Sequence, residues 1–329
     1  MTTTRRTVAA TLALLSATLL LAIAPAAPAA AQEFPSRPIR FVVPFPPGSG
    51  TDTSARYFGR KLTELTGQPV VVDNKPGANG FIAVKAVLAS PADGYTVFVG
   101  SNSTLAVNVA LFRALPYDPT TDLAPLTMMM RAPALIVVPG ASPHASLADL
   151  IAGARARPGV IDYGAGSAGY QLMGELFNDV ARVRTTHVPF KGAGEAVVGV
   201  VSGTVHMAFA EVTSVRELVQ SGRVRALAVA ADRRVPALPD VPTAAEAGLP
   251  GFAAYTWVGA MVSARTPRAE TERLAELLTR IETLPETREF YERIGAETMR
   301  GGPQEMRAFQ GAEIELWKRI ATEARVPRQ

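Results

Sequence analysis

Short β-branched runs alternate with segments of helical periodicity along the chain, and this alternation is the strongest constraint on its fold. The run Ile39–Val43 ends in a Pro/Gly loop, after which Ala55, Phe58 and Leu62 recur at helical spacing. Strands and helices joined in turn by short loops are typical of a doubly wound α/β sheet. Ligands of such sheets bind at the carboxyl ends of the strands. The sequence therefore predicts an α/β fold with its site on the loops that follow strands.

The loop at residues 44–52 is the first candidate site. Gly48 and Gly50 allow positive φ and a close approach of the backbone, and Thr51 or Asp52 can cap the following helix. Exposed N–H groups and the positive end of a helix dipole together form a seat for an anion. An ordinary tight turn between a strand and a helix is the alternative.

Composition limits the classes of function. The chain has 329 residues, of which 48% are hydrophobic and 19% charged, enough for two globular domains. Its net charge of +4 is too small to indicate nucleic-acid binding. The absence of cysteine excludes disulfides, a thiolate nucleophile and Cys-ligated zinc, and the three scattered histidines lack metal-site spacing. We expect no metal, no cofactor and no nucleic-acid partner.

Residues 1–31 have the pattern of a signal peptide. Arg5 and Arg6 form a positive start, residues 8–31 carry no charge, and small residues at 29–31 suit a signal peptidase. An uncleaved membrane anchor is the rival interpretation. The prediction is a cleaved signal and an exported protein, with Sec or twin-arginine export left open.

The loop at residues 164–169 spells G-x-G-x-x-G and suggests two enzyme classes. A dinucleotide-binding oxidoreductase needs an acidic residue at the end of the next strand, and residues 185–190 lack one. An exported serine hydrolase could use Ser167 in a loose nucleophile elbow, with His187 and His206 the only later histidines. Both remain alternatives.

Several motifs, in consistent order, are shared with one family. They are PFPPGSGTD (44–52), NKPGA (74–78), PADGYT (91–96), LPYDP (115–119), HVPFKG (187–192), RALAV (225–229) and LPDVPT (238–243) with EAG (246–248). Over essentially the whole mature chain the sequence resembles the Bug family of extracytoplasmic solute receptors, the substrate-binding component of tripartite tricarboxylate transporters.

The resemblance implies a two-lobed periplasmic-binding-protein fold of type II, each lobe a mainly parallel sheet flanked by helices. Lobe 1 would comprise residues 32–131 and 252–329, and lobe 2 residues 132–251. A small carboxylate would bind between the lobes and pass to membrane permease subunits, without catalysis, and the receptor would be a monomer.

The resemblance also implies a set of ligand-binding residues. They are Phe45, Pro46, Gly48, Ser49, Gly50, Thr51, Asp52, Ser101, Asn102, Ser103, Gly164, Ala165, Gly166, Ser167, Ala168, Lys191, Ala210 and Glu211. The chain departs from the family pattern at Ser49, where glycine is usual, and in a shorter loop at 164–169. It also reads Phe209-Ala210-Glu211 where Phe-Asp-Asn is common, so the identity of the carboxylate and the role of Glu211 stay open.

Overall fold

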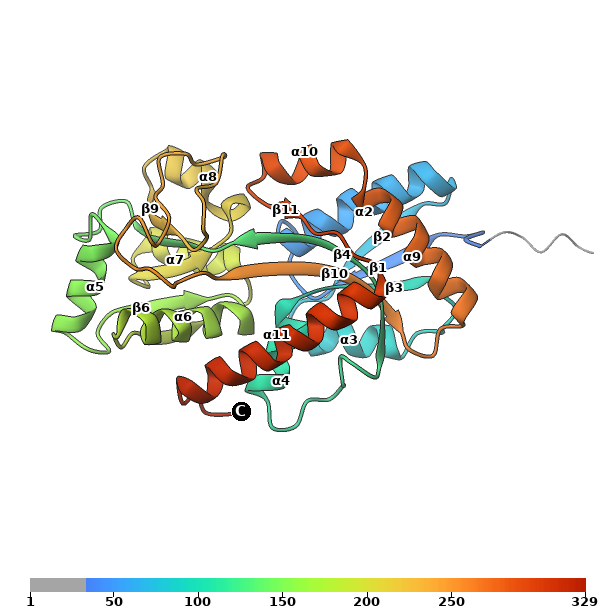
Figure 1. Ribbon diagram of the computed structural model, residues 1–329, viewed down its shortest axis with the longest axis horizontal. Helices are drawn as coiled ribbons and strands as arrows, with labels where there is room; N and C mark the ends of the chain where they lie inside the picture. Colours follow the sequence, from blue (N-terminus) through green and yellow to red (C-terminus); the bar gives the residue numbers. More distant parts are fainter. Residues whose placement is uncertain (1–33) are drawn as a thin grey trace, which may run out of the picture. The chain divides into compact units, whose positions relative to one another are not determined.

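The strands form two sheets, and the chain passes between them more than once (Figure 1). The computed structural model describes residues 34–329, of which 37–329 form one unit. The predicted signal peptide, residues 1–31, lies outside the described residues. Within 34–329, no helix has the length and apolar character that a membrane crossing needs.

The first sheet has the strand order β11-β4-β10-β3-β1-β2. Its strands are β1 (Ile39–Val43), β2 (Val70–Asn74), β3 (Thr96–Ser101), β4 (Leu123–Pro133), β10 (Tyr255–Ser263) and β11 (Glu297–Thr298). Its helical segments are α2 (Gly50–Thr66), η1 (Ala78–Gly80), α3 (Phe81–Leu88), η2 (Ser103–Val107), α4 (Asn108–Leu111), α9 (Arg268–Glu282), α10 (Pro285–Arg293) and α11 (Pro303–Glu323). We call this sheet and its helices the first lobe.

The second sheet has the strand order β7-β6-β8-β5-β9. Its strands are β5 (Leu135–Pro139), β6 (Asp162–Ala165), β7 (Thr186–Pro189), β8 (Met207–Ala210) and β9 (Val224–Val229). Its helices are α5 (Leu147–Ala156), α6 (Ala168–Ala181), α7 (Ala193–Ser202) and α8 (Val212–Gln220). This sheet and its helices form the second lobe.

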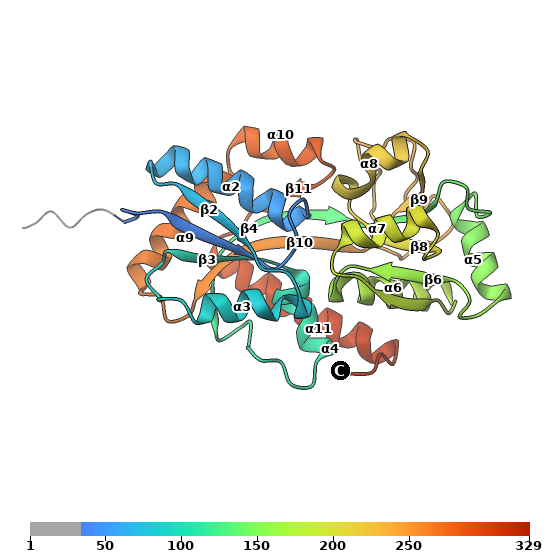
Figure 2. The ribbon, with the colours of Figure 1, turned by 180° about the vertical axis from the view of Figure 1, so that it is seen from behind.

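The predicted two-lobed α/β fold is confirmed, but the sheets are mixed rather than mainly parallel. In the first lobe β1 pairs in parallel with β2 and β3, whereas β10 runs antiparallel to β3 and β4. In the second lobe β6 pairs in parallel with β7 and β8, and β5 runs antiparallel to β8 and β9. The antiparallel ladders arise because the strands that carry the chain between lobes enter each sheet against its direction (Figure 2).

Three alanines join the chain where it passes between the sheets. Ala134 separates β4 from β5, and its N–H donates to Ala254 O at 2.9 Å. The N–H of Ala254 donates to Ala230 O at 3.0 Å, and that of Ala230 to Ala134 O at 2.7 Å. These backbone bonds bring β4, β9 and the start of β10 together at one place. The lobe boundaries proposed at 131/132 and 251/252 lie within a few residues of it and remain a prediction.

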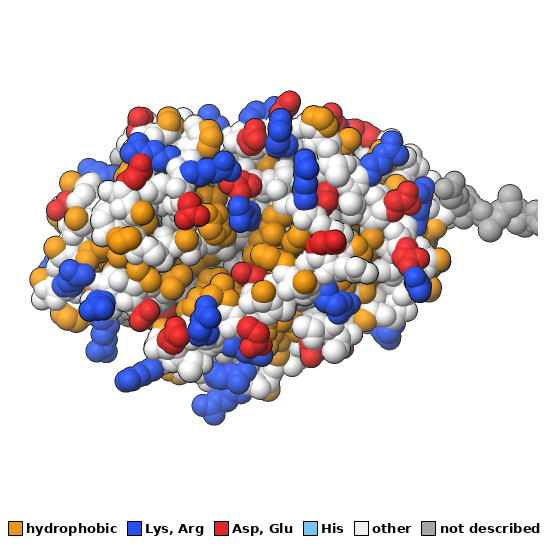
Figure 3. All heavy atoms as spheres, viewed as in Figure 1, with side chains coloured by type: hydrophobic (Ala, Val, Ile, Leu, Met, Phe, Trp, Pro, Cys, Tyr) orange, Lys and Arg blue, Asp and Glu red, His pale blue; other side chains and the backbone are white. Residues whose placement is uncertain are grey.

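Helix α11 is fixed to the strand that crosses between the lobes. The indole N–H groups of Trp257 on β10 and Trp317 on α11 both donate to Glu313 Oε2, at 2.8 and 3.0 Å. On the face of the molecule drawn in Figure 3, hydrophobic side chains gather in the middle, and charged side chains of both signs are interspersed around them. A single core cluster extends from Val42 in the first lobe to Phe177 in the second.

Candidate functional site

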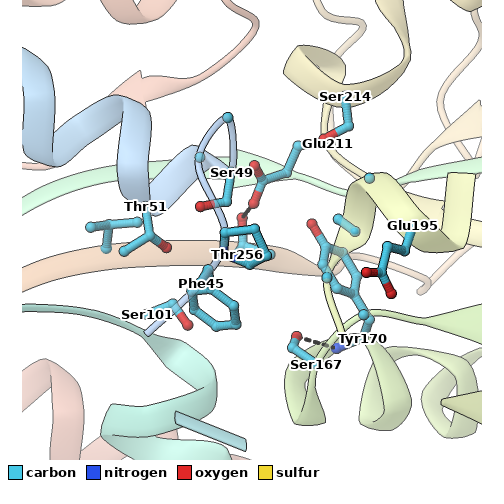
Figure 4. Close-up of a pocket in the computed structure, with 18 of the residues that line it drawn as sticks. Phe45, Ser49, Thr51, Ser101, Ser167, Tyr170, Glu195, Glu211, Ser214 and Thr256 are labelled. Carbon is cyan, nitrogen blue, oxygen red and sulfur yellow. Dashed lines mark hydrogen bonds between the residues drawn. The ribbon is translucent and has the colours of Figure 1, made fainter. Parts of the chain in front are cut away.

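A cavity of about 340 Å³ lies between loops of the two lobes (Figure 4). Its walls come from the loop after β1, the end of β3, the starts of α6, α7 and α8, and one face of β10. The lining residues are Phe45, Pro46, Pro47, Gly48, Ser49, Gly50, Thr51, Ser101, Asn102, Gly166, Ser167, Tyr170, Gly192, Ala193, Gly194, Glu195, Glu211, Ser214, Thr256 and Val258.

Several helices begin at this cavity, and they come from both lobes. In the first lobe α2 and η2 start beside it, and in the second lobe α6, α7 and α8 do. The N-terminus of a helix carries unpaired N–H groups and a partial positive charge. The lining contains no lysine, arginine or histidine. Whatever positive potential the lining offers an anion therefore comes from backbone, hydroxyl and side-chain amide donors.

The loop after β1 supplies the cap of the helix that follows it and contains a glycine turn. Ser49, not Thr51 or Asp52, is the N-cap of α2, and its hydroxyl accepts from Asp52 N at 3.2 Å. Gly48 has φ +84°, a conformation that favours glycine, with no atom close to where a Cβ would lie. The glycine there is required by the turn, and its backbone lies at the cavity wall.

Asp52 points away from the cavity and supports the loop from behind. Its carboxylate accepts from Gly48 N and Asn74 Nδ2, both at 2.9 Å, and from Arg56 Nε at 3.0 Å. Burial by itself would raise the pKa of Asp52, but these hydrogen bonds outweigh it and lower the pKa of the carboxyl. Asp52 is thus an ionised brace between the loop, β2 and α2.

Ser103 and Ser167 connect the two lobes beside the cavity. Ser103 Oγ donates to Ser167 Oγ at 3.1 Å and accepts from Gly169 N at 3.0 Å. Ser167 is the N-cap of α6. A hydroxyl of the first lobe therefore satisfies a backbone donor in the first turn of a second-lobe helix.

Glu211 is a buried acid whose side chain reaches from the second lobe to the first. It is the N-cap of α8 and 9% exposed, and Thr256 Oγ1 on β10 donates to its Oε1 at 2.7 Å (Figure 4). A Cβ at Gly50, the first residue of α2, would overlap its Oε2. Burial raises the pKa of Glu211, although Thr256 and the Gly50 N–H favour its charged form.

The Asn102 Nδ2 amide before η2 is buried at the cavity and makes no hydrogen bond within residues 34–329. The Tyr170 hydroxyl on α6 is buried there too, and it faces Glu211, whose charged form it favours. Burial, and then Glu211, raise the pKa of Tyr170, so its hydroxyl stays protonated. Buried donors are nearly always satisfied, so the Asn102 amide indicates a place where an acceptor can bind.

Many of the residues expected at the site line this cavity. They are Phe45, Pro46, Gly48, Ser49, Gly50, Thr51, Ser101, Asn102, Gly166, Ser167 and Glu211. The others lie behind or beside it: Asp52, Ser103, Gly164, Ala165, Ala168, Lys191 and Ala210. Lys191 is exposed at a neighbouring cavity that shares Phe45 and Ser167 with this one. Gly164 sits inside β6, where a Cβ would crowd Phe190.

Other lining residues were not expected from the sequence. Tyr170 and Thr256 follow the periodicity of their helix and strand, and nothing in that pattern shows that they face a ligand cavity. The position of Glu195 could have been predicted. It lies in the first turn of α7, the helix that follows β7 and Gly192, so it is at the same sheet edge as the other loops.

The geometry does not favour either enzyme alternative. Ser167 Oγ bonds Ser103, and none of its hydrogen bonds in the described chain involves a histidine. A Cβ at Gly166 would overlap the backbone of Gly192 and Ala193. That glycine is needed for packing of one loop on the next, and not for the approach of a pyrophosphate.

Two lobes with a cavity lined by opposed helix N-termini define a two-lobed solute-binding protein. Residues 54–326 match the family described as "Tripartite tricarboxylate transporter family receptor". The chain belongs to this family of solute receptors. The protein BugT of Bordetella pertussis is 37% identical over 305 residues, which cover 91% of this chain and 92% of BugT.

Solved structures give the same result. Rhodopseudomonas palustris Rpa4515 with adipate has a TM-score of 0.85 and 35% identity, over 89% of this chain and 98% of that one. MatC from the same organism, with bound malate, has a TM-score of 0.81 and 30% identity, over 87% and 99%. A further solved relative, BugD, is a periplasmic binding protein.

Proposed function

We propose that this receptor captures a small organic carboxylate in the cavity between its lobes. The observation that carries the proposal is the buried, unpartnered donor Asn102 Nδ2, which lies with the Tyr170 hydroxyl beside helix N-termini from both lobes. Carboxylate oxygens accept hydrogen bonds of this kind and are favoured by helix dipoles. The same chemistry is consistent with relatives that bind adipate and malate.

The donors present are sufficient for useful affinity. A micromolar dissociation constant corresponds to about 8 kcal/mol. Hydrogen bonds to a charged group contribute about 1.5–3 kcal/mol each. Four or five such bonds, from amides at the starts of α2 and α7 together with Tyr170 and Asn102, reach this range before ordering costs are subtracted.

The site residues act in two groups under this proposal. Those that line the cavity contact the solute, and Asp52 and Ser103 hold the contacting loops in place. Lys191, at the neighbouring cavity, attracts the anion toward the opening that Phe45 and Ser167 share. The receptor works in the periplasm as a monomer, needs no cofactor or nucleic acid, performs no catalysis, and delivers its solute to the membrane permease subunits of a tripartite transporter.

Isothermal titration calorimetry of the mature protein tests the proposal. Adipate, malate, citrate and acidic amino acids form the panel, and at least one should bind saturably with one site per chain. Recovery of every bound solute unchanged by mass spectrometry checks that no turnover occurs. Flat titrations across the panel, or a chemically altered solute, would contradict the proposal.

A further inference from the structure

The N-terminus of α2 is already in contact with a carboxylate, that of Glu211. Glu211 begins α8 in the second lobe, yet its Oε2 lies so near Gly50 in the first lobe that a Cβ there would overlap it. Thr256 Oγ1 donates to the other carboxylate oxygen at 2.7 Å. The protein's own acid therefore occupies the kind of position in which an anion is stabilised by a helix start.

The surroundings of Glu211 supply donors for more than one carboxylate but no counter-ion. The titratable groups that line the cavity are Tyr170 on α6, Glu195 on α7 and Glu211 itself, and the lining holds no basic side chain. Asp52 of α2 faces the other way, toward Arg56 and Gly48. The Tyr170 hydroxyl faces Glu211 itself. Asn102, 1% exposed, has a buried Nδ2 amide at the same cavity that makes no hydrogen bond among the described residues. This unpaired donor is a separate sign that an acceptor enters the cavity that Glu211 lines.

We propose that Glu211 is an internal competitor: it holds the N-terminus of α2 until a solute carboxylate takes its place, and so it sets which solutes this receptor accepts. This inference rests on the proposed function. Two ionised carboxylates cannot share one helix start in a buried cavity without a cation, because their repulsion is poorly screened there. A solute carboxylate must therefore either meet a protonated Glu211 or displace the ionised one from Gly50.

The consequence is a receptor that discriminates by charge. Solutes with a single carboxylate and a neutral remainder are favoured over solutes with a second charge near Glu211 and Glu195. Affinity for any carboxylate decreases as pH rises and Glu211 ionises. Replacing Glu211 by glutamine removes the competing charge and keeps the shape of the side chain.

Calorimetry with adipate and malate compares the wild type with Glu211→Gln. We expect the dissociation constant of Glu211→Gln to be about fivefold lower or better at pH 8, and the two proteins to converge as the pH is lowered and Glu211 is protonated. Glu282→Gln is the matched control, because Glu282 is also buried and also accepts from a threonine, Thr127, and from a backbone N–H, that of Gly301. Glu282 lies outside the cavity lining, so the Glu282→Gln variant should bind the solute with the affinity of the wild type.

A second measurement does not depend on which solute the receptor carries. Acetate is titrated into each protein while the amide resonances of Gly50 and Thr51 are followed by NMR. These resonances should respond at about fivefold lower acetate concentration in Glu211→Gln than in the wild type. Glu211→Ala, whose side chain cannot reach Gly50, should behave like Glu211→Gln and serves if the glutamine variant is poorly folded.

The outcomes separate the two proposals. Equal acetate responses, or adipate binding that is weaker in Glu211→Gln, would overturn the inference. If no solute of the panel (adipate, malate, citrate or an acidic amino acid) binds the wild type, the result counts against the proposed function, and the acetate titration still decides the role of Glu211.

Discussion

Ser103 and Ser167, which belong to different lobes, meet at a single hydrogen bond of 3.1 Å between their hydroxyl oxygens. Ser103 also accepts from Gly169 N, so that one hydroxyl links the start of η2 to the first turn of α6. Because Ser167 lines the cavity, this link joins the two walls between which a solute would bind.

Replacing Ser103 by alanine should weaken solute binding without unfolding the protein. Loss of a neutral hydrogen bond costs about 0.5–1.5 kcal/mol, which corresponds to about a threefold to tenfold lower affinity. Calorimetry with whichever solute of the panel binds measures this. Ser202→Ala, at the far end of α7, is the control and should bind like the wild type. An unchanged affinity in Ser103→Ala would show that the link does not contribute to the bound state.

Removing the Tyr170 hydroxyl should separate binding from stability. Tyr170→Phe deletes a buried hydroxyl that faces the Glu211 carboxylate, so the free energy of unfolding should fall by no more than about 1.5 kcal/mol. Solute affinity should fall about tenfold, because one hydrogen bond to a carboxylate is lost. Tyr291→Phe is matched to it, since that hydroxyl is also buried but faces Ser54, away from the cavity. Equal affinities for both variants would remove Tyr170 from the site.

Asp52 should make stability depend on acid pH. Its pKa is lower in the folded protein than its ordinary value, so the folded state binds the proton less readily than the unfolded chain. The stabilisation is complete above about pH 4 and is lost as pH falls through the folded-state pKa. Asp52→Asn should cost about 1–3 kcal/mol at neutral pH, with a smaller cost at lower pH. Urea unfolding at several pH values checks this, and a cost that is constant down to the acid limit would exclude the ionised brace.

Gly50→Ala should reduce binding through a contact with the other lobe. The backbone of Gly50 does not have positive φ, so alanine causes no backbone strain there. The added Cβ would instead overlap Glu211 Oε2. We expect about tenfold weaker solute binding, and recovery of most of it in the double variant Gly50→Ala/Glu211→Ala, where the overlapping side chain is gone. No recovery in the double variant would mean that alanine acts on the α2 turn itself.

Local sequence patterns predicted the elements well where backbone and capping rules decide them. Strand β1 and the positive φ of Gly48 both follow from residue type and spacing. The N-cap of α2 was predicted wrongly as Thr51 or Asp52. Ser49 and Asp52 have the S-x-x-D spacing of a capping motif, and this spacing identifies the cap correctly.

The site itself was predictable to the level of loops and less so to the level of side chains. Parallel strands bring their carboxyl ends to one edge, and the loops after β1, β3 and β6 all contribute to the lining of the candidate cavity. Which way a side chain turns is decided by tertiary contacts. Asp52 turns toward Asn74, on a strand distant in sequence, and Thr256 reaches the cavity only because β10 crosses from the second lobe.

The antiparallel pairs in the two sheets likewise depend on the path of the chain in three dimensions. A chain that leaves one lobe and returns must enter each sheet beside strands that already run the other way, and short-range patterns carry no information on that order. The parallel prediction holds for β1 with β2 and β3, and for β6 with β7 and β8, where strand, helix and strand follow directly.

The ring of hydrogen bonds among Ala134, Ala230 and Ala254 uses main-chain atoms alone. A junction made in this way depends on no polar side chain, so substitutions in the cavity walls leave its hydrogen bonds in place. The three alanines are buried, so a larger side chain at any of them would crowd the crossing. The chemistry of the pocket and the connection between the lobes are therefore carried by different parts of the chain.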